Sequence, residues 1–172
     1  RTLEVAYTPG HASHHVSFFD ASSGVALVGD TAGVAVNGGY VLPPTPPPDI
    51  DLELWAQSIE RILAWSPSTL FLTHFGPAMN VRSHCAELSD HLQETSSYVR
   101  ASLNEPGTDE ERSARFEEWL RQQLRQHMTD VRVQEYIVAA GFRYQWQGLA
   151  RYWRKNATRK SDLERAELAK EK

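Results

Sequence analysis

Three of the seven histidines in this 172-residue chain lie close together, at His11, His14 and His15. They follow a Pro-Gly corner that comes directly after residues 2–7, where apolar and polar side chains alternate as in a strand. Imidazole nitrogen is a common ligand of Zn²⁺ and related ions, and a ligand at the end of a strand is held in place by the sheet. The spacing therefore predicts a metal site where this first strand ends.

Two later segments have the same form, an apolar strand that ends in a potential ligand. VALVGD ends in Asp30, and TLFLTH ends in His74. We expect His11, Asp30 and His74 to converge on metal, with the Asp30 carboxylate as the natural bridge between two ions. Ordinary roles compete with this interpretation, because each residue also fits a turn or a hydrogen-bonded strand end. The ordered set of three is a stronger signal than any one of them.

The remaining histidines and the single cysteine have simpler explanations. His84, His91 and His127 fall in segments with helical periodicity, so we expect them at the surface or in helix packing. Cys85 excludes an internal disulfide and fits a reducing compartment, which predicts a cytoplasmic protein. Its simplest role is that of a small apolar residue on a helix face. Since no apolar run approaches the roughly 20 residues that cross a bilayer, no membrane partner is expected.

Short strands must position these candidate ligands. We expect strands at residues 2–7, 16–19, 25–28 and 69–73, with a hairpin over 16–28. The segment 25–28 is continuously apolar, so it should be buried on both faces of a sheet, and the strand at 69–73 is also expected to be buried. Between them, 42–49 (LPPTPPPD) holds five prolines, which forbid a helix or a central strand. That composition predicts a stiff polyproline-like excursion that serves as a spacer or as a lid edge near the substrate mouth.

Helices are expected around and after these strands. Asp49 or Asp51 can cap a helix that ends before Pro67, and residues 81–103 form one long amphipathic face. A capping box starts the next helix: it consists of Thr108 and Glu111. Further helices are predicted over residues 131–140 and 145–156, and the charged stretch from 158 onward is expected to fray or be disordered. A strand, then an excursion with a helix, then another strand predicts an α/β protein.

Charge is uneven along the chain, although the net value of -4 says little by itself. From Arg143 onward there are nine Lys and Arg residues against four Asp and Glu residues. A basic helical region of this kind binds an anionic partner or is simply a solvated face. The aromatic and basic side chains of this region have two possible roles, contact with an anionic substrate or packing between helices. They are Arg143, Tyr144, Trp146, Arg151, Tyr152 and Trp153.

Three motifs in order carry a family resemblance. TPGHASHHVSFFD, VALVGDTAG and FLTHFGP together resemble the second half of the metallo-β-lactamase fold of hydrolases. The resemblance implies half of an αββα sandwich over residues 1–79, followed by a helical C-terminal subdomain over 80–172. It implies a two-metal zinc site in which His11 binds the first metal, Asp30 both and His74 the second. In that loop His15 would support the ligands or contact substrate, and His14 would be exposed.

One departure from the family pattern is serious. The principal HxHxDH motif, which supplies the remaining ligands and any catalytic residue, is absent, and no HxH pair occurs in the sequence. Either the chain is a C-terminal fragment of a longer hydrolase, or it is a relative that has lost metal chemistry. We favour the fragment, because a lineage freed from metal binding has little reason to keep three ligand types. The chain alone is then expected to be inactive and to bind metal weakly or not at all.

The resemblance implies a hydrolase in the intact protein. Metal-bound hydroxide would attack an ester, thioester or lactone carbonyl of a small-molecule substrate. Relatives include thioesterases such as glyoxalase II, lactonases, β-lactamases and nucleases, so the fold alone does not choose the substrate. Expected protein partners are an upstream fragment or a second copy of the chain. The alternative is a metal-free binding or regulatory module that uses the basic helical region, although nucleic acid is not the expected partner.

Overall fold

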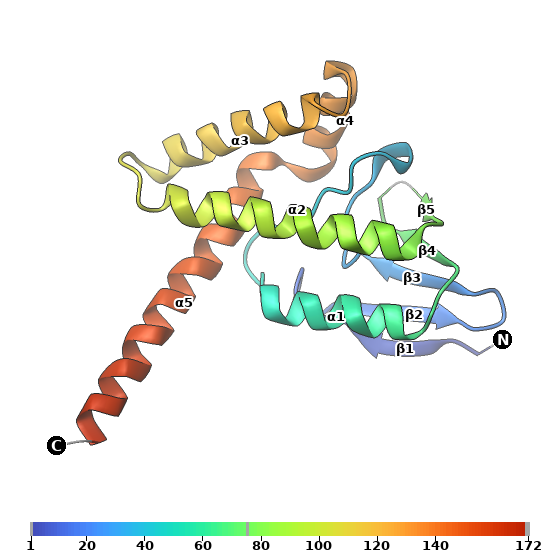
Figure 1. Cartoon of the computed structure of the whole chain (residues 1–172), viewed down its shortest axis with the longest axis horizontal. Helices are drawn as coiled ribbons and strands as arrows, with labels where there is room; N and C mark the ends of the chain where they lie inside the picture. The colour runs from blue at the N-terminus through green and yellow to red at the C-terminus, as the bar shows by residue number, and fades with distance from the viewer. Residues whose placement is uncertain (1, 75, 171–172) are drawn as a thin grey trace.

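The computed structural model describes residues 2–74 and 76–170. Its strands are β1 (Glu4–Tyr7), β2 (Val16–Asp20), β3 (Val25–Gly29), β4 (Thr69–Leu72) and β5 (Gly76–Ala78). Its helices are α1 (Leu52–Ala64), α2 (Val81–Ser102), α3 (Asp109–Arg125), α4 (Asp130–Ala140) and α5 (Phe142–Lys170), with a short 3₁₀ turn at Val36–Gly38 (Figure 1). The order of strands and helices confirms the predicted α/β class with a helical C-terminal region.

The five strands form one mixed sheet in the order β1-β2-β3-β4-β5. Only β3 and β4 run parallel, and the other neighbours are antiparallel. With these directions, the end of β1, the start of β2 and the ends of β3 and β4 all lie at one edge of the sheet. Tyr7 pairs with Val16 there, and Gly29 pairs with Leu72. The predicted ligands therefore leave the sheet at a common edge.

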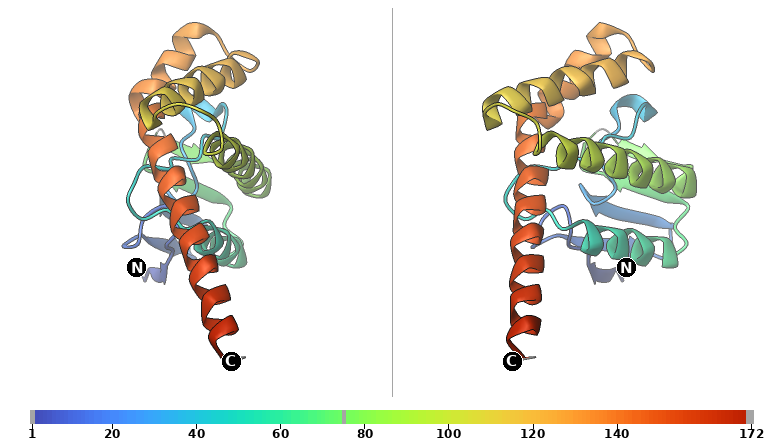
Figure 2. Two further views of the ribbon diagram at one scale, coloured as in Figure 1. Left: turned by 90° about the vertical axis from the view of Figure 1, so that its left-hand side faces the viewer. Right: turned by 60° about the vertical axis from the view of Figure 1, so that its left-hand side comes forward.

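Helices α1 and α2 lie on the same side of the sheet (Figures 1 and 2). The strand side chains that point toward them are fully or almost fully buried, including Ala26 and Val28 of β3 and Leu70 of β4. From the helices, Trp55 and Leu88 complete this core with no exposed surface. The buried apolar stripe of each helix is the one that its sequence periodicity predicts.

The opposite face of the sheet is apolar but exposed. Strand side chains alternate between faces, and five large apolar ones that point away from the helices retain between 41% and 61% of their surface. They are Val5, Tyr7, Val16, Leu27 and Phe71. Leu27 and Phe71 are direct cross-strand neighbours, so this surface is continuous across β3 and β4. The prediction that residues 25–28 are buried on both faces is therefore wrong for this chain, and residues 69–73 are likewise buried on one face only.

Local signals set the ends of the helices. The Asp51 carboxylate accepts a hydrogen bond from the Leu54 amide and caps α1, so Asp51 rather than Asp49 is the cap. The predicted capping box at the start of α3 is present. Helix α5 continues through residue 170 without the predicted fraying and extends past the body of the molecule (Figure 2), while residues 171–172 lie outside the described part. Within the described part, no helix is both long and apolar enough to cross a membrane.

Residues 42–45 of the proline segment are buried in the interior, so this half is packed in the fold instead of serving as a spacer or lid edge, whereas residues 46–49 are half-buried or exposed. Leu42 and Thr45 are completely buried. The Thr45 hydroxyl donates to the backbone carbonyl of Gln145 in α5 at 3.2 Å. A side chain at Gly148 would clash with the Thr45 carbonyl, so the glycine permits this close approach of helix and segment. Since proline lacks an amide donor, the segment can be buried with few backbone donors left to satisfy.

Candidate metal centre

The loop between β1 and β2 carries the first histidines and is fixed at both ends. The Thr8 amide donates to the His15 carbonyl at 3.0 Å, which closes the loop. Gly10 has a φ of 131° and its carbonyl accepts from the Asp51 amide at 2.9 Å. A side chain at Gly10 would clash with the backbone of Trp55, so only glycine fits between the loop and α1. The start of α1 thereby fixes the position of His11.

The carboxylate of Asp30 lies at the centre of the candidate site. Its Oδ2 atom is 3.7 Å from His11 Nε2 and 3.9 Å from His15 Nε2. Its Oδ1 atom faces a different imidazole, His74 Nε2, at 3.4 Å. Two ligands of a tetrahedral zinc site with 2.0–2.1 Å bonds lie roughly 3.3–3.4 Å apart. All three residues predicted as metal ligands are therefore close together, and the two carboxylate oxygens face different imidazoles.

Contacts of the Nδ1 atoms orient the His11 and His15 rings so that their Nε2 atoms face Asp30. His11 Nδ1 donates to the Pro44 carbonyl at 2.8 Å, which leaves the Nε2 lone pair directed at the carboxylate. His15 Nδ1 lies 3.3 Å from the Thr31 hydroxyl, so its Nε2 also faces Asp30. Such contacts are what holds ligating imidazoles in metalloproteins. Gly29 permits this arrangement, because a side chain there would clash with the His15 ring.

The electrostatics of the cluster suit a cation. Burial lowers the pKa of His11, and this effect exceeds the opposing influence of the Pro44 carbonyl and the Asp30 charge, so the imidazole is neutral as metal binding requires. Burial alone would raise the pKa of Asp30, but the neighbouring imidazoles, His15 first, outweigh it and lower that pKa. Asp30 Oδ1 is buried and has no hydrogen-bond donor in the described part of the chain. An ionised, unsatisfied carboxylate oxygen beside several imidazoles is a donor set that fits a divalent metal.

His15 has the same geometric qualifications as a ligand as His11. Together with Asp30, these two histidines offer three ligand atoms that all lie within 4.8 Å of one another. The sequence prediction gave His15 only a supporting role, and the structure draws no such distinction between the two rings. The sequence does indicate a ligand role for His15, because this residue directly precedes β2 and is fixed by the sheet. His14 is exposed, as predicted, and its ring stacks on that of His15.

The other candidate side chains lie away from the cluster. His84 and His91 contact backbone carbonyls of the 32–41 segment, which agrees with the predicted packing role. Cys85 is buried, and burial raises the pKa of its thiol to about 11, so it is a packing residue rather than a nucleophile. Of the predicted aromatic and basic group, Trp146 is buried in the core, and the Arg143 guanidinium pairs with Glu117 of α3 at 2.7 Å.

Comparisons with known proteins agree with this fold. Residues 1–74 match the model of the metallo-beta-lactamase superfamily. A metallo-beta-lactamase fold-containing protein of Sulfurisphaera tokodaii is 36% identical over 74 residues, which cover 43% of this chain and 27% of that protein. The crystal structure of a metallo-beta-lactamase family protein from Thermus thermophilus matches with a TM-score of 0.61 and 24% identity. The match covers 90% of this chain and 44% of the Thermus protein.

A beta-lactamase domain protein from Burkholderia ambifaria is also similar, with a TM-score of 0.54, 20% identity, and coverage of 88% of this chain and 41% of the other. At these identities the two solved structures show the fold alone. The chain spans less than half the length of each relative that it matches. Residues 1–74 are therefore similar to the metallo-beta-lactamase superfamily, whose members are generally metal-dependent hydrolases.

Proposed function

We propose that the cluster at the sheet edge is one wall of a two-metal hydrolase site that acts on an ester, thioester or lactone. The observation that carries the proposal is the Asp30 carboxylate, whose two oxygens face different imidazoles and whose buried Oδ1 lacks a hydrogen-bond donor among the described residues. A purely structural carboxylate at this depth would be expected to have its oxygens hydrogen-bonded.

Each residue has a distinct task in this proposal. Asp30, His11, His15 and His74 would hold the metals, with His11 and His15 next to Asp30 Oδ2 and His74 next to Asp30 Oδ1. The chemistry that a bound divalent metal supplies is a lowered pKa of water and polarisation of a carbonyl oxygen. Contacts from Pro44 and Thr31 hold the His11 and His15 rings at fixed angles, so those ligands need little reorganisation when an ion binds.

The exposed sheet face supports the second part of the proposal, that the remaining wall comes from another polypeptide segment. Continuous apolar surfaces of this kind are uncommon on monomeric proteins and mark interaction sites. The matched solved structures are more than twice as long as this chain, as their covered shares of 44% and 41% show. We propose that a further segment, either upstream sequence or a second copy, packs on Leu27 and Phe71 and brings the missing ligands to the Asp30 edge.

Cobalt binding tests the ligand roles, because Co²⁺ replaces Zn²⁺ and gives a visible absorption spectrum. We expect the chain by itself to bind Co²⁺ weakly, and Asp30→Asn to remove that signal. His11→Ala and His15→Ala measured separately decide how much each ring contributes. The matched control is His14→Ala, which removes an exposed imidazole of the same loop and should leave the spectrum unchanged.

Two results would contradict the proposal. If Asp30→Asn bound Co²⁺ as well as the unchanged chain, Asp30 would not be a ligand. If the purified chain held two metal equivalents tightly with no other polypeptide, the site would not be incomplete. Hydrolysis of thioester and lactone substrates by a protein that includes the missing segment, and its loss in His74→Ala, tests the reaction itself.

A further inference from the structure

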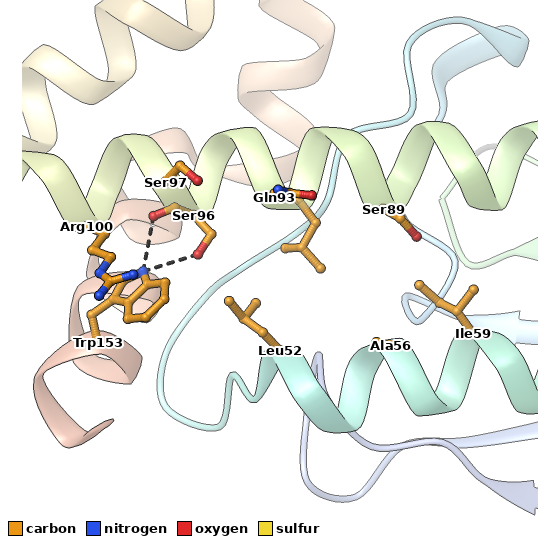
Figure 3. A pocket seen from close by; sticks show the side chains of 10 residues that line it. Leu52, Ala56, Ile59, Ser89, Gln93, Ser96, Ser97, Arg100 and Trp153 are labelled. Carbon is orange, nitrogen blue, oxygen red and sulfur yellow. Dashed lines mark hydrogen bonds between the residues drawn. The ribbon is translucent and has the colours of Figure 1, made fainter. Parts of the chain in front are cut away.

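A groove of about 380 Å³ separates α1 from α2 on the outer side of the helical layer (Figure 3). Small-molecule sites in proteins start at about 300 Å³, so the groove is large enough for a ligand. Leu52 and Ile59 line it from α1, and Leu92 and Trp153 add apolar surface from α2 and α5. None of these residues belongs to the histidine and aspartate cluster, which lies on the Trp55 side of α1.

Small side chains keep the groove open. Ala56 of α1 and Ser89, Ser96 and Ser97 of α2 line the two helix surfaces that face each other. Larger residues at these positions would interdigitate and close the gap, as ridges and grooves normally do between packed helices. In Figure 3 the Leu52 and Ile59 side chains from α1 point into the gap, so its lining is mainly hydrocarbon.

A cation, the Arg100 guanidinium, lies at one end of the groove. Trp153 is held by hydrogen bonds from its indole nitrogen to the carbonyl and hydroxyl oxygens of Ser96, both at 3.1 Å. The Arg100 guanidinium lies 4.6 Å from the centre of the Trp153 ring. In the described part of the chain this guanidinium has no carboxylate partner. Its hydrogen-bond donors therefore remain available to a ligand at the groove end.

A second cavity of about 640 Å³ begins at the same two residues, Arg100 and Trp153. Arg112 and Arg154 also line it, with asparagine side chains between them, and no acidic residue is among its described lining. The Asp109 carboxylate pairs with both Arg112 and Arg154, so it offsets only part of their charge. An apolar groove therefore continues directly into a basic, polar cavity.

We propose that the groove and this cavity together bind a single-chain acyl amphiphile with an anionic head. Its hydrocarbon tail would lie between Leu52, Ile59 and Leu92, where burial of each methylene is favourable. Its carboxylate or phosphate would lie at Arg100, where a guanidinium donates to two oxygens of one anion. This site is separate from the proposed hydrolytic site and does not depend on metal.

Decanoate is the test ligand, and 1-decanol is its neutral counterpart of equal chain length. Binding of each to the whole chain is measured by calorimetry at fixed ionic strength, with circular dichroism to confirm that every variant is folded. Arg100→Gln removes the cation, and Ala56→Phe fills the groove from an exposed helix position that should tolerate a larger side chain. The matched control is Arg82→Gln, because Arg82 is an exposed arginine of the same helix that does not line the groove.

We expect saturable binding of one decanoate per chain. Arg100→Gln should weaken decanoate about fivefold, as expected for a partly solvated ion pair, without changing 1-decanol. Ala56→Phe should abolish the binding of both ligands, and Arg82→Gln should change neither. The proposal is overturned if decanoate does not bind, if Arg82→Gln weakens it as much as Arg100→Gln, or if Ala56→Phe leaves binding intact, which would place the ligand on the exposed sheet face. A dimer that Ala56→Phe dissociates would also overturn it, because a second copy would then occupy the groove.

Discussion

Trp55→Phe is the substitution that best tests how the core holds the candidate site. The Trp55 indole N–H donates to the Thr31 carbonyl at 2.7 Å, and the ring packs edge-on against His11 at 5.6 Å between centroids. Thr31 follows Asp30 directly and is itself completely buried. The indole thus links α1 to Thr31 and to His11. Phenylalanine would keep an aromatic ring at this position but remove the hydrogen-bond donor.

The magnitude follows from two losses. A buried carbonyl left without its donor costs about 1–3 kcal/mol. Replacing the larger ring in a site with no exposed surface adds about 1–2 kcal/mol, a fraction of the cost of complete truncation. We therefore expect the free energy of unfolding in urea to fall by about 2–5 kcal/mol. Co²⁺ affinity should fall about tenfold, because a support of the ligand loop is lost.

Trp65→Phe is the matched control. Trp65 is only partly buried, stacks on Phe19, and has no indole hydrogen bond in the described part of the chain. Its replacement should cost less than about 1 kcal/mol, since neither a buried donor nor a closed cavity is involved. Equal losses for the two variants would refute the reasoning, because the bond to Thr31 would then contribute nothing measurable.

Two further predictions concern backbone conformation and pH. Gly10→Ala should lower the free energy of unfolding in urea by about 3 kcal/mol, because the new side chain adds backbone strain and clashes with Trp55. The control is Gly38→Ala, which should cost about 1 kcal/mol, because Gly38 also has a positive φ but faces open space. Burial alone would raise the pKa of Glu117, but hydrogen bonds from Arg121 and Arg143 outweigh it and lower that pKa. The carboxylate therefore stabilises the fold above its unfolded pKa of about 4.3, and this contribution is lost as the pH falls through the lower folded value. Glu117→Gln should cost about 1 kcal/mol at pH 7 and nothing near pH 2 in urea unfolding, and an equal cost at both would contradict the assignment.

Local patterns predicted most of the strands and helices, because their signals lie within a few residues. Alternation marked β1, the capping box marked α3, and apolar strands ending in a ligand marked the edge of the sheet. The strand β5 was missed, because Gly76–Ala78 is short, contains proline, and has no apolar alternation. This segment forms a strand because it pairs with the free edge of β4, and such a tertiary contact cannot be predicted from the local sequence.

The sequence predicted three residues of the candidate site, but not the ligand geometry of His15 or the contacts that support the histidines. His11, Asp30 and His74 follow strands, so sheet topology brings them together. The contact from His11 to Pro44 joins residues 33 positions apart, and that from Trp55 to Thr31 joins residues 24 apart. No sequence periodicity predicts contacts between such distant residues. The exposure of the sheet face with Leu27 and Phe71 could not be predicted either, because burial of that face depends on elements that the strand sequence does not specify.

The proline segment is the clearest case of a role that only the fold assigns. On one side the Pro44 carbonyl holds the His11 ring, and on the other the Thr45 hydroxyl contacts α5. The Tyr152 hydroxyl of α5 also donates to Glu53 of α1 at 2.8 Å. These contacts cross the division proposed between residues 79 and 80, so the helices after that point brace the loop that carries His11. Because this bracing passes through buried backbone carbonyls, the position of the His11 ring depends on the packing of α5 as well as on the sheet.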